Sequence, residues 1–216
     1  MRFVFRICYE QDIRLVKHGG QRFWYALLLA ALVAAPFLLD RFYVGELSFV
    51  FIYAIAGLGL MVLTGYTGQV SLGHAAFLAI GAYAHAWLLS RGWPFVAALP
   101  AATLLTGIIG AVVALPVVRL VGIYLAIATL AFLVIVEQLA MRWTSVTGGG
   151  RGMVVGGVEI FGVDFSSPQR FYFLCLPLLI LCLIGVMNLL RAPTGRAMLA
   201  VRDSEVAARS MSPNTP

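Results

Sequence analysis

Residues 57–86, GLGLMVLTGYTGQVSLGHAAFLAIGAYAHA, place glycines and small polar side chains inside an otherwise apolar chain. In hydrocarbon, a backbone amide or carbonyl that has left a helix finds no water to pair with. Residues 64–73, called the interrupted segment below, are therefore costly against lipid. We expect them at an interface, inside protein or beside a hydrated cavity, as in a passage through a membrane.

The overall composition is that of a membrane protein. Of 216 residues, 62% are hydrophobic and 11% are charged, and the mean hydropathy is +0.96. Soluble domains have about 45–50% apolar and about 25% charged residues. Because a spanning helix needs about 20 mostly apolar residues, we predict an all-α polytopic fold with about six spans and an interrupted third helix. These spans are residues 23–39, 47–64, 70–89, 94–118, 120–141 and 171–190.

The net charge of +6 is explained by topology better than by a nucleic-acid partner. Ten of the 15 basic residues lie before the first span, after the last span, or at Arg119 between the fourth and fifth spans. Lys and Arg collect on the cytoplasmic side of membrane proteins. With six spans, this bias predicts that both termini are cytoplasmic.

The chain is predicted to be one integral-membrane domain, residues 1–216. It comprises a cytoplasmic arm (1–22), a transmembrane region (23–190) and a cytoplasmic tail (191–216). An external segment (142–170) contains TSVTGGGRG at residues 144–152, and we expect a loose, mobile loop there because glycine costs backbone entropy to order. No phosphate-binding motif of the GxxxxGK[ST] type is present, so the chain is not expected to be an enzyme.

The candidate residues for a translocation path are the polar and small residues of the interrupted segment and two ionisable residues, one directly after the segment and one near the external end of the fifth span. They are Thr64, Gly65, Tyr66, Thr67, Gly68, Gln69, Ser71, Gly73, His74 and Glu137. An ionisable residue in a span is a functional candidate, but a structural partner for His74 and an interfacial position for Glu137 are the alternatives. His74 and His85 are eleven residues apart, about 16 Å along a helix, so no metal site is predicted.

The tail from Gly195 to Met211 is short and amphipathic. Arg202, Glu205 and Arg209 fall on one stripe of a helix. Such a helix lies in the headgroup region of a membrane or docks into a groove on a cytoplasmic partner. The pattern does not choose between these two roles.

Several of these motifs together resemble the permease subunits of branched-chain amino acid ABC importers, of the LivM type. The resemblance is carried by LTGYTGQVSLGHAAF at residues 63–77, GAY at 81–83, RLVGIYLAIATLAF at 119–132 and TGGGRG at 147–152. In the tail, GRA at 195–197 and RDSEVAARSM at 202–211 resemble the segment that docks onto ATPase subunits.

The resemblance implies a location, partners and roles for residues. It implies a multi-pass protein of the bacterial inner membrane that works with a second permease subunit, with ATP-binding subunits and with a periplasmic substrate-binding protein. ATP would be bound by the partner subunits, and this chain would hold no cofactor. The residues implied to couple to the ATPase are Gly195, Arg196, Arg202, Asp203, Glu205, Ala207, Ala208 and Arg209.

Two other interpretations remain open from the sequence. Broken helices at membrane depth also mark secondary transporters and channels that work alone. The residues after Met211 depart from the family pattern and end at Pro216, so we also expect a truncated or split subunit, which would fit a non-transporting remnant.

Overall fold

The computed structural model describes residues 19–117, 120, 122–160 and 162–204. Its long helices are α2 (Gly19–Leu38), α3 (Arg41–Leu60), α4 (His74–Ser90), α5 (Phe95–Val117), α6 (Ile123–Arg142) and α8 (Pro168–Arg191). Shorter elements are the π-helix η1 (Met61–Tyr66), α7 (Thr144–Thr147), the 3₁₀-helix η2 (Gly149–Arg151), the paired strands β1 (Glu159–Ile160) and β2 (Val163–Asp164), and α9 (Pro193–Asp203).

The all-α polytopic class is confirmed. Within the described ranges, four helices are long and apolar enough to cross a membrane: α3 with η1, α5, α6 and α8. The apolar part of α2, Phe23–Leu38, is shorter, and α4 has 17 residues, so the number of six spans stays a prediction. The break in the helices lies just before α4, which begins at His74 and not at residue 70.

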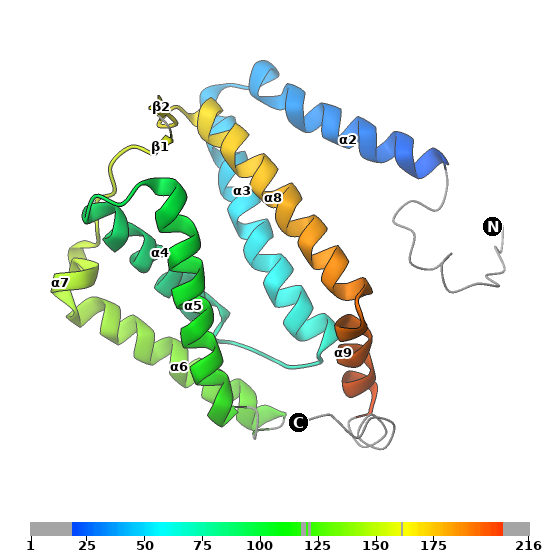
Figure 1. The fold of residues 1–216 in the computed structure, drawn as a ribbon, viewed down its shortest axis with the longest axis vertical. Helices are drawn as coiled ribbons and strands as arrows, with labels where there is room; N and C mark the ends of the chain where they lie inside the picture. The colour runs from blue at the N-terminus through cyan, green and yellow to red at the C-terminus, as the bar shows by residue number, and fades with distance from the viewer. Residues whose placement is uncertain (1–18, 118–119, 121, 161, 205–216) are drawn as a thin grey trace.

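The helices form two groups (Figure 1). In one group α3 and α8 lie side by side and run in the same direction, with α2 near their beginning and α9 near their end. In the other group α4 packs against α5 and α6. Residues 67–73 have no helical structure and connect the end of η1 to the start of α4. The interrupted segment therefore links the two groups.

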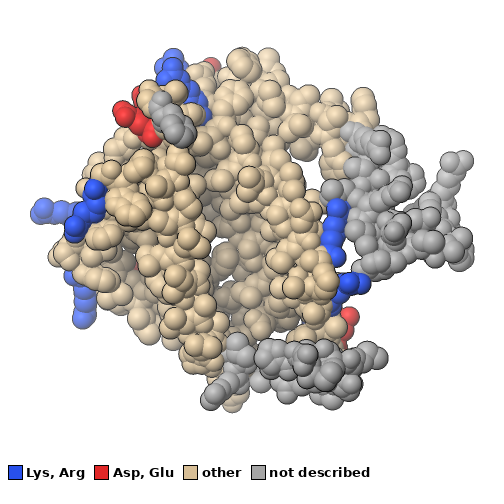
Figure 2. Space-filling model, viewed as in Figure 1, with Lys and Arg blue, Asp and Glu red and all other residues tan. Residues whose placement is uncertain are grey.

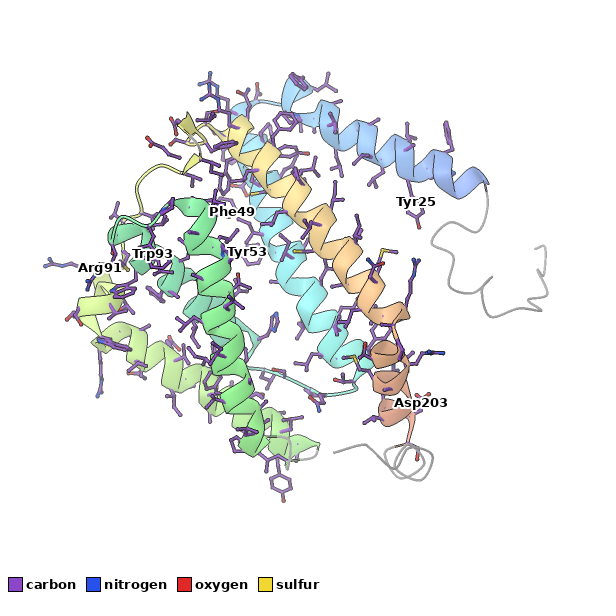
Figure 3. All side chains as sticks on the ribbon, in the orientation of Figure 1. Tyr25, Phe49, Tyr53, Arg91, Trp93 and Asp203 are labelled. Carbon is purple, nitrogen blue, oxygen red and sulfur yellow. The ribbon has the colours of Figure 1, made fainter. Side chains whose placement is uncertain are left out.

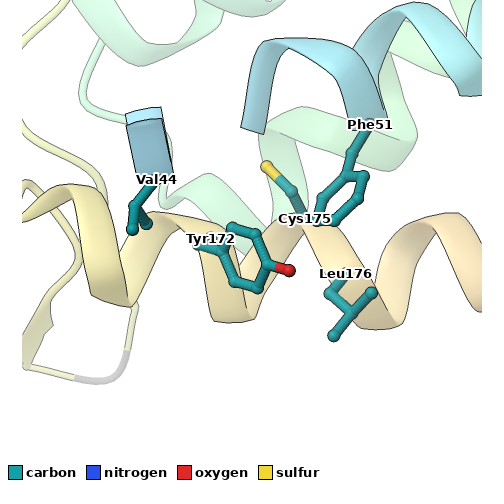
Figure 4. Close-up of a cluster of buried hydrophobic side chains, with 5 residues drawn as sticks. All are labelled: Val44, Phe51, Tyr172, Cys175 and Leu176. Atoms are coloured by element: carbon teal, nitrogen blue, oxygen red, sulfur yellow. The ribbon is translucent and has the colours of Figure 1, made fainter. Parts of the chain in front are cut away.

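The contact between α3 and α8 contains the main buried cluster (Figure 4). Its members are Val44, Phe51, Tyr172, Cys175 and Leu176. The rings of Phe51 and Tyr172 lie 4.9 Å apart between centroids. Most other large apolar side chains are exposed, and charged side chains occupy only a few places at the edge of the face in Figure 2. This surface suits a lipid environment, in which helices can be apolar on every side.

A hydrogen bond joins α2 to α8, and its loss should be measurable. The Tyr172 hydroxyl donates to the Leu32 carbonyl over 2.8 Å, and the Tyr172 side chain is buried. We expect Tyr172→Phe to cost about 1 kcal/mol and to lower the melting temperature in detergent by about 2–4 °C. Tyr53 on α3 is 69% exposed and is the control (Figure 3). Equal melting temperatures for Tyr172→Phe and Tyr53→Phe would contradict the role of this bond.

The external glycine-rich stretch is compact, in contrast to the loose loop expected from the sequence. The buried Thr147 hydroxyl donates to the carbonyls of Ala140 (2.6 Å) and Trp143 (2.8 Å) and accepts from the Gly149 amide (3.2 Å). Gly148 has a φ of 75°, a conformation that glycine adopts without steric cost. The threonine therefore organises the glycines into a turn at the end of α6.

The hairpin that follows is anchored to the start of α8. The Arg170 guanidinium donates to the Asp164 carbonyl over 2.8 Å. Hydrogen bonds from the Ser166 hydroxyl and amide lower the pKa of the Asp164 carboxyl. Ser167 caps α8 by accepting from the Arg170 amide, as serine commonly does at helix starts.

Candidate functional site

The first three residues of the interrupted segment, 64–66, belong to the π-helix η1, which extends α3. The Thr67 amide donates to the Val62 carbonyl over 3.3 Å, a bond that spans five residues. The Gln69 amide then donates to the Leu63 carbonyl over 3.3 Å. Such wide turns are rare in proteins, and those that occur are often at functional sites. Here the wide turn lets the chain leave the helix while part of its backbone stays hydrogen-bonded.

The two threonines of this segment make hydrogen bonds to the preceding turn. Thr64 donates its hydroxyl to the Leu60 carbonyl over 2.8 Å, and Thr67 donates its hydroxyl to the Leu63 carbonyl. Hydrogen bonds from a hydroxyl to the preceding turn often bend a helix. The threonine side chains therefore contribute to the break in the helix.

The end of the segment is held against α6. The Thr129 hydroxyl accepts from the Leu72 amide over 3.0 Å. Gly73 lies so close that a Cβ atom there would stand 2.5 Å from the Thr129 carbonyl oxygen. Thr129 is six residues into α6, about 9 Å along its axis. The segment thus contacts α6 well inside a predicted span, and only glycine fits at position 73.

His74, the first residue of α4, reaches back to α3. Its Nε2 atom lies 2.9 Å from the Ala56 carbonyl oxygen. A carbonyl only accepts, so Nε2 carries the proton. A Cβ atom at Gly59 would lie 3.2 Å from the His74 ring, so the ring fits over a glycine. This contact provides His74 with the structural partner that was one of its two expected roles.

The beginning of the segment contacts α9. The Arg202 guanidinium donates to the Gly65 carbonyl, and a Cβ atom on Gly68 would lie 3.0 Å from Arg202 Cγ. Gly68 has a φ of 70°, which disfavours any other residue. Hydrogen bonds that involve a charged group contribute about 1.5–3 kcal/mol. Two candidate sites that are far apart in the sequence are therefore in direct contact.

The remaining path candidates are not all brought together. Tyr66 and Ser71 are half-buried within the segment, and Gln69 is exposed. Glu137 is exposed on α6, eight residues beyond Thr129 and thus about 12 Å further along the helix. Its place in a path stays a prediction.

The coupling candidates divide between described and undescribed residues. Gly195 is buried in the first turn of α9, where a Cβ atom would stand 2.3 Å from the Leu190 carbonyl oxygen. Arg196, Arg202 and Asp203 lie on α9. The remaining candidates, Glu205, Ala207, Ala208 and Arg209, lie outside the described residues.

The single helix expected from Gly195 to Met211 is wrong at Ser204. Helix α9 ends at Asp203, and Ser204 has extended backbone angles of −163° and 106°. Aspartate and serine bond to nearby backbone groups and so favour helix ends over helix interiors. The stripe predicted through Arg202, Glu205 and Arg209 is therefore not carried by one continuous helix.

Three contact residues were not selected from the sequence: Ala56, Gly59 and Thr129. Thr129 carries a visible signal, because it is a hydroxyl residue within the apolar run LAIATLAF at residues 125–132. Ala56 and Gly59 look like ordinary small residues of a membrane helix, which let neighbours approach closely. Their pairing with His74 becomes visible only when α4 folds back against α3.

These features define a polytopic α-helical membrane protein in which non-helical backbone joins η1 to α4 and contacts α6 and α9. A family model described as "Branched-chain amino acid transport system / permease component" matches residues 42–215. The chain belongs to this family, whose members are transport subunits.

Two relatives are each named "High-affinity branched-chain amino acid transport system permease protein LivM". They come from Escherichia coli (strain K12) and Salmonella typhimurium (strain LT2), and each is 37% identical over 88% of this chain. The chain spans 51% of the length of each relative. No solved structure matches the chain.

Proposed function

We propose that this chain is a permease subunit of an ABC importer for branched-chain or related amino acids. The family match and the names of the two relatives support this substrate class. A second permease subunit would complete the path, a periplasmic protein would deliver the substrate, and separate subunits would bind and hydrolyse ATP. The observation that carries the proposal is the contact between the interrupted segment and α9.

The proposed orientation places both termini in the cytoplasm of a bacterium, with the chain in its inner membrane. Three arginines lie at the common end of α3 and α8: Arg191 is the last residue of α8, and Arg196 and Arg202 are on α9. Arg41 and Arg170 lie at the common beginning of these two helices. Since the N-terminal arm is also basic, the positive-inside tendency supports a cytoplasmic position for α9.

In this orientation the interrupted segment lies toward the cytoplasmic end of the path. Its backbone amides and carbonyls, together with the half-buried Ser71 and the exposed Gln69, can exchange hydrogen bonds with water or with the charged groups of an amino acid. Non-helical backbone at membrane depth is tolerated where it is buried in protein or lines a hydrated cavity. We infer that the segment changes its exposure as the importer alternates between its two states.

Cysteine labelling tests the proposed path. With Cys8, Cys175 and Cys182 replaced by alanine, Gln69→Cys and Ser71→Cys should react with a membrane-impermeant maleimide in inside-out vesicles of the assembled importer. Leu104 on α5 is 68% exposed and apolar, so Leu104→Cys is the lipid-facing control and should not react. Unreactive cysteines at both 69 and 71 in every nucleotide state would overturn the path assignment.

Co-purification tests the partner assignment separately. The chain should retain the ATP-binding subunits after solubilisation in mild detergent, and reconstituted importer should take up leucine only with ATP and the binding protein. Uptake of leucine by the chain alone would instead establish a stand-alone transporter.

A further inference from the structure

Arg202 joins α9 to the interrupted segment through a charged hydrogen bond. The acceptor, the Gly65 carbonyl, lies near the end of the π-helix η1. The last carbonyls of a helix have no partner within it, and a cation near a helix end is favoured by the helix dipole. Arg202 is therefore well placed to bind the end of η1.

The aliphatic part of Arg202 makes a second contact. Its Cβ and Cγ atoms would lie 3.7 Å and 3.0 Å from a Cβ atom on Gly68, a glycine with a φ of 70°. The aliphatic part of the Arg202 side chain thus packs against the backbone of Gly68, where the chain leaves η1. Contact at Gly65 and at Gly68 fixes both the distance and the direction of the segment relative to α9.

The other end of the segment is attached to different helices. Leu72 and Gly73 are held by Thr129 of α6, and His74 is bonded to Ala56 of α3. Helix α9 itself is joined to α8 through a turn at Ala192. A rotation of α9 about this turn would displace the beginning of the segment, while its end stays with α6 and α3.

We propose that Arg202 is a positioning residue that transmits movement of α9 to the interrupted segment, so that ATP hydrolysis by the partner subunits changes the exposure of the path. The proposal rests on the proposed function and assigns the transmission to one side chain. Arg202 acts through the Gly65 carbonyl and the Gly68 backbone and does not itself contact the transported amino acid.

The test measures leucine uptake and ATP hydrolysis together in the reconstituted importer. We expect Arg202→Ala to lower the amount of leucine taken up per ATP hydrolysed by about tenfold or more, as loss of a charged hydrogen bond predicts. Arg202→Lys, which retains a cationic donor, should recover part of the uptake per ATP. Gly68→Ala, which displaces the arginine stem, should lower it as Arg202→Ala does.

Arg191, at the end of α8, provides the matched control, since Arg191→Ala also removes one guanidinium near α9. Uptake per ATP at the wild-type level in Arg202→Ala, or an equal loss in Arg191→Ala, would overturn the proposal. If Arg202→Ala does not accumulate in the membrane, Arg202→Lys and Gly68→Ala provide the test. Wild-type uptake per ATP in both of these variants would also overturn the proposal. Failure of the wild-type chain to take up leucine with its partners would refute the proposed function instead.

Discussion

Gly73→Ala is expected to abolish transport and to destabilise the contact between the interrupted segment and α6. The new Cβ atom would stand 2.5 Å from the Thr129 carbonyl oxygen and 3.2 Å from Thr129 Cβ. Because this neighbour is helical backbone, the clash is relieved only by moving the segment. Overpacking of this kind costs about 1–3 kcal/mol, which corresponds to about 2–12 °C in melting temperature. Leucine uptake and thermal unfolding in detergent provide the measurements.

The control for this substitution is Gly57→Ala. Gly57 lies on α3, and no atom lies within 4 Å of a Cβ atom built there. Alanine is favoured over glycine in a helix by about 1 kcal/mol, so Gly57→Ala should be neutral or stabilising. If Gly73→Ala has the same melting temperature as Gly57→Ala and the wild type, the close approach to Thr129 does not contribute to stability.

Thr147→Val should have the largest effect on the external face. Valine keeps the shape of threonine but leaves the buried Gly149 amide and the Ala140 carbonyl without their hydroxyl partner. Each unsatisfied buried group costs about 1–3 kcal/mol, so we expect a loss of about 2–4 kcal/mol and a melting temperature about 4–16 °C lower. Trypsin should also cut sooner at the exposed Arg151.

Thr147→Ser distinguishes the hydroxyl from the methyl group. It retains the hydrogen bonds and removes one methyl group, a loss of about 1 kcal/mol. Equal melting temperatures for the valine and serine variants would mean that packing, and not hydrogen bonding, holds the turn.

The positions of the apolar helices were predictable because hydropathy is a local property. The interrupted segment was predictable for a related reason, since threonine, glycine and glutamine at residues 64–69 are costly in lipid wherever the rest of the chain lies. The family resemblance also rested on these residues. Local patterns were sufficient to locate the break in the helices.

The partners of the segment were not predictable from local patterns. Thr129 lies 57 residues from Leu72, and Arg202 lies 137 residues from Gly65, so their contacts depend on how the two helix groups assemble. A mobile loop was expected at the external glycines because a glycine-rich composition indicates only that the backbone has many accessible conformations. Their order depends on one buried hydroxyl, that of Thr147.

The π-helix has a consequence for changes in chain length. Each residue turns a helix by about 100°, and the Thr67–Val62 bond encloses one residue more than a regular turn would. Deleting one residue between Met61 and Tyr66 would make the turn regular and leave the chain that follows in nearly the same direction, whereas inserting one would rotate that chain by about 100° about the axis of α3. After an insertion the carbonyl that Arg202 binds and the glycine that its side chain contacts would face elsewhere, so we expect this stretch to tolerate a deletion better than an insertion.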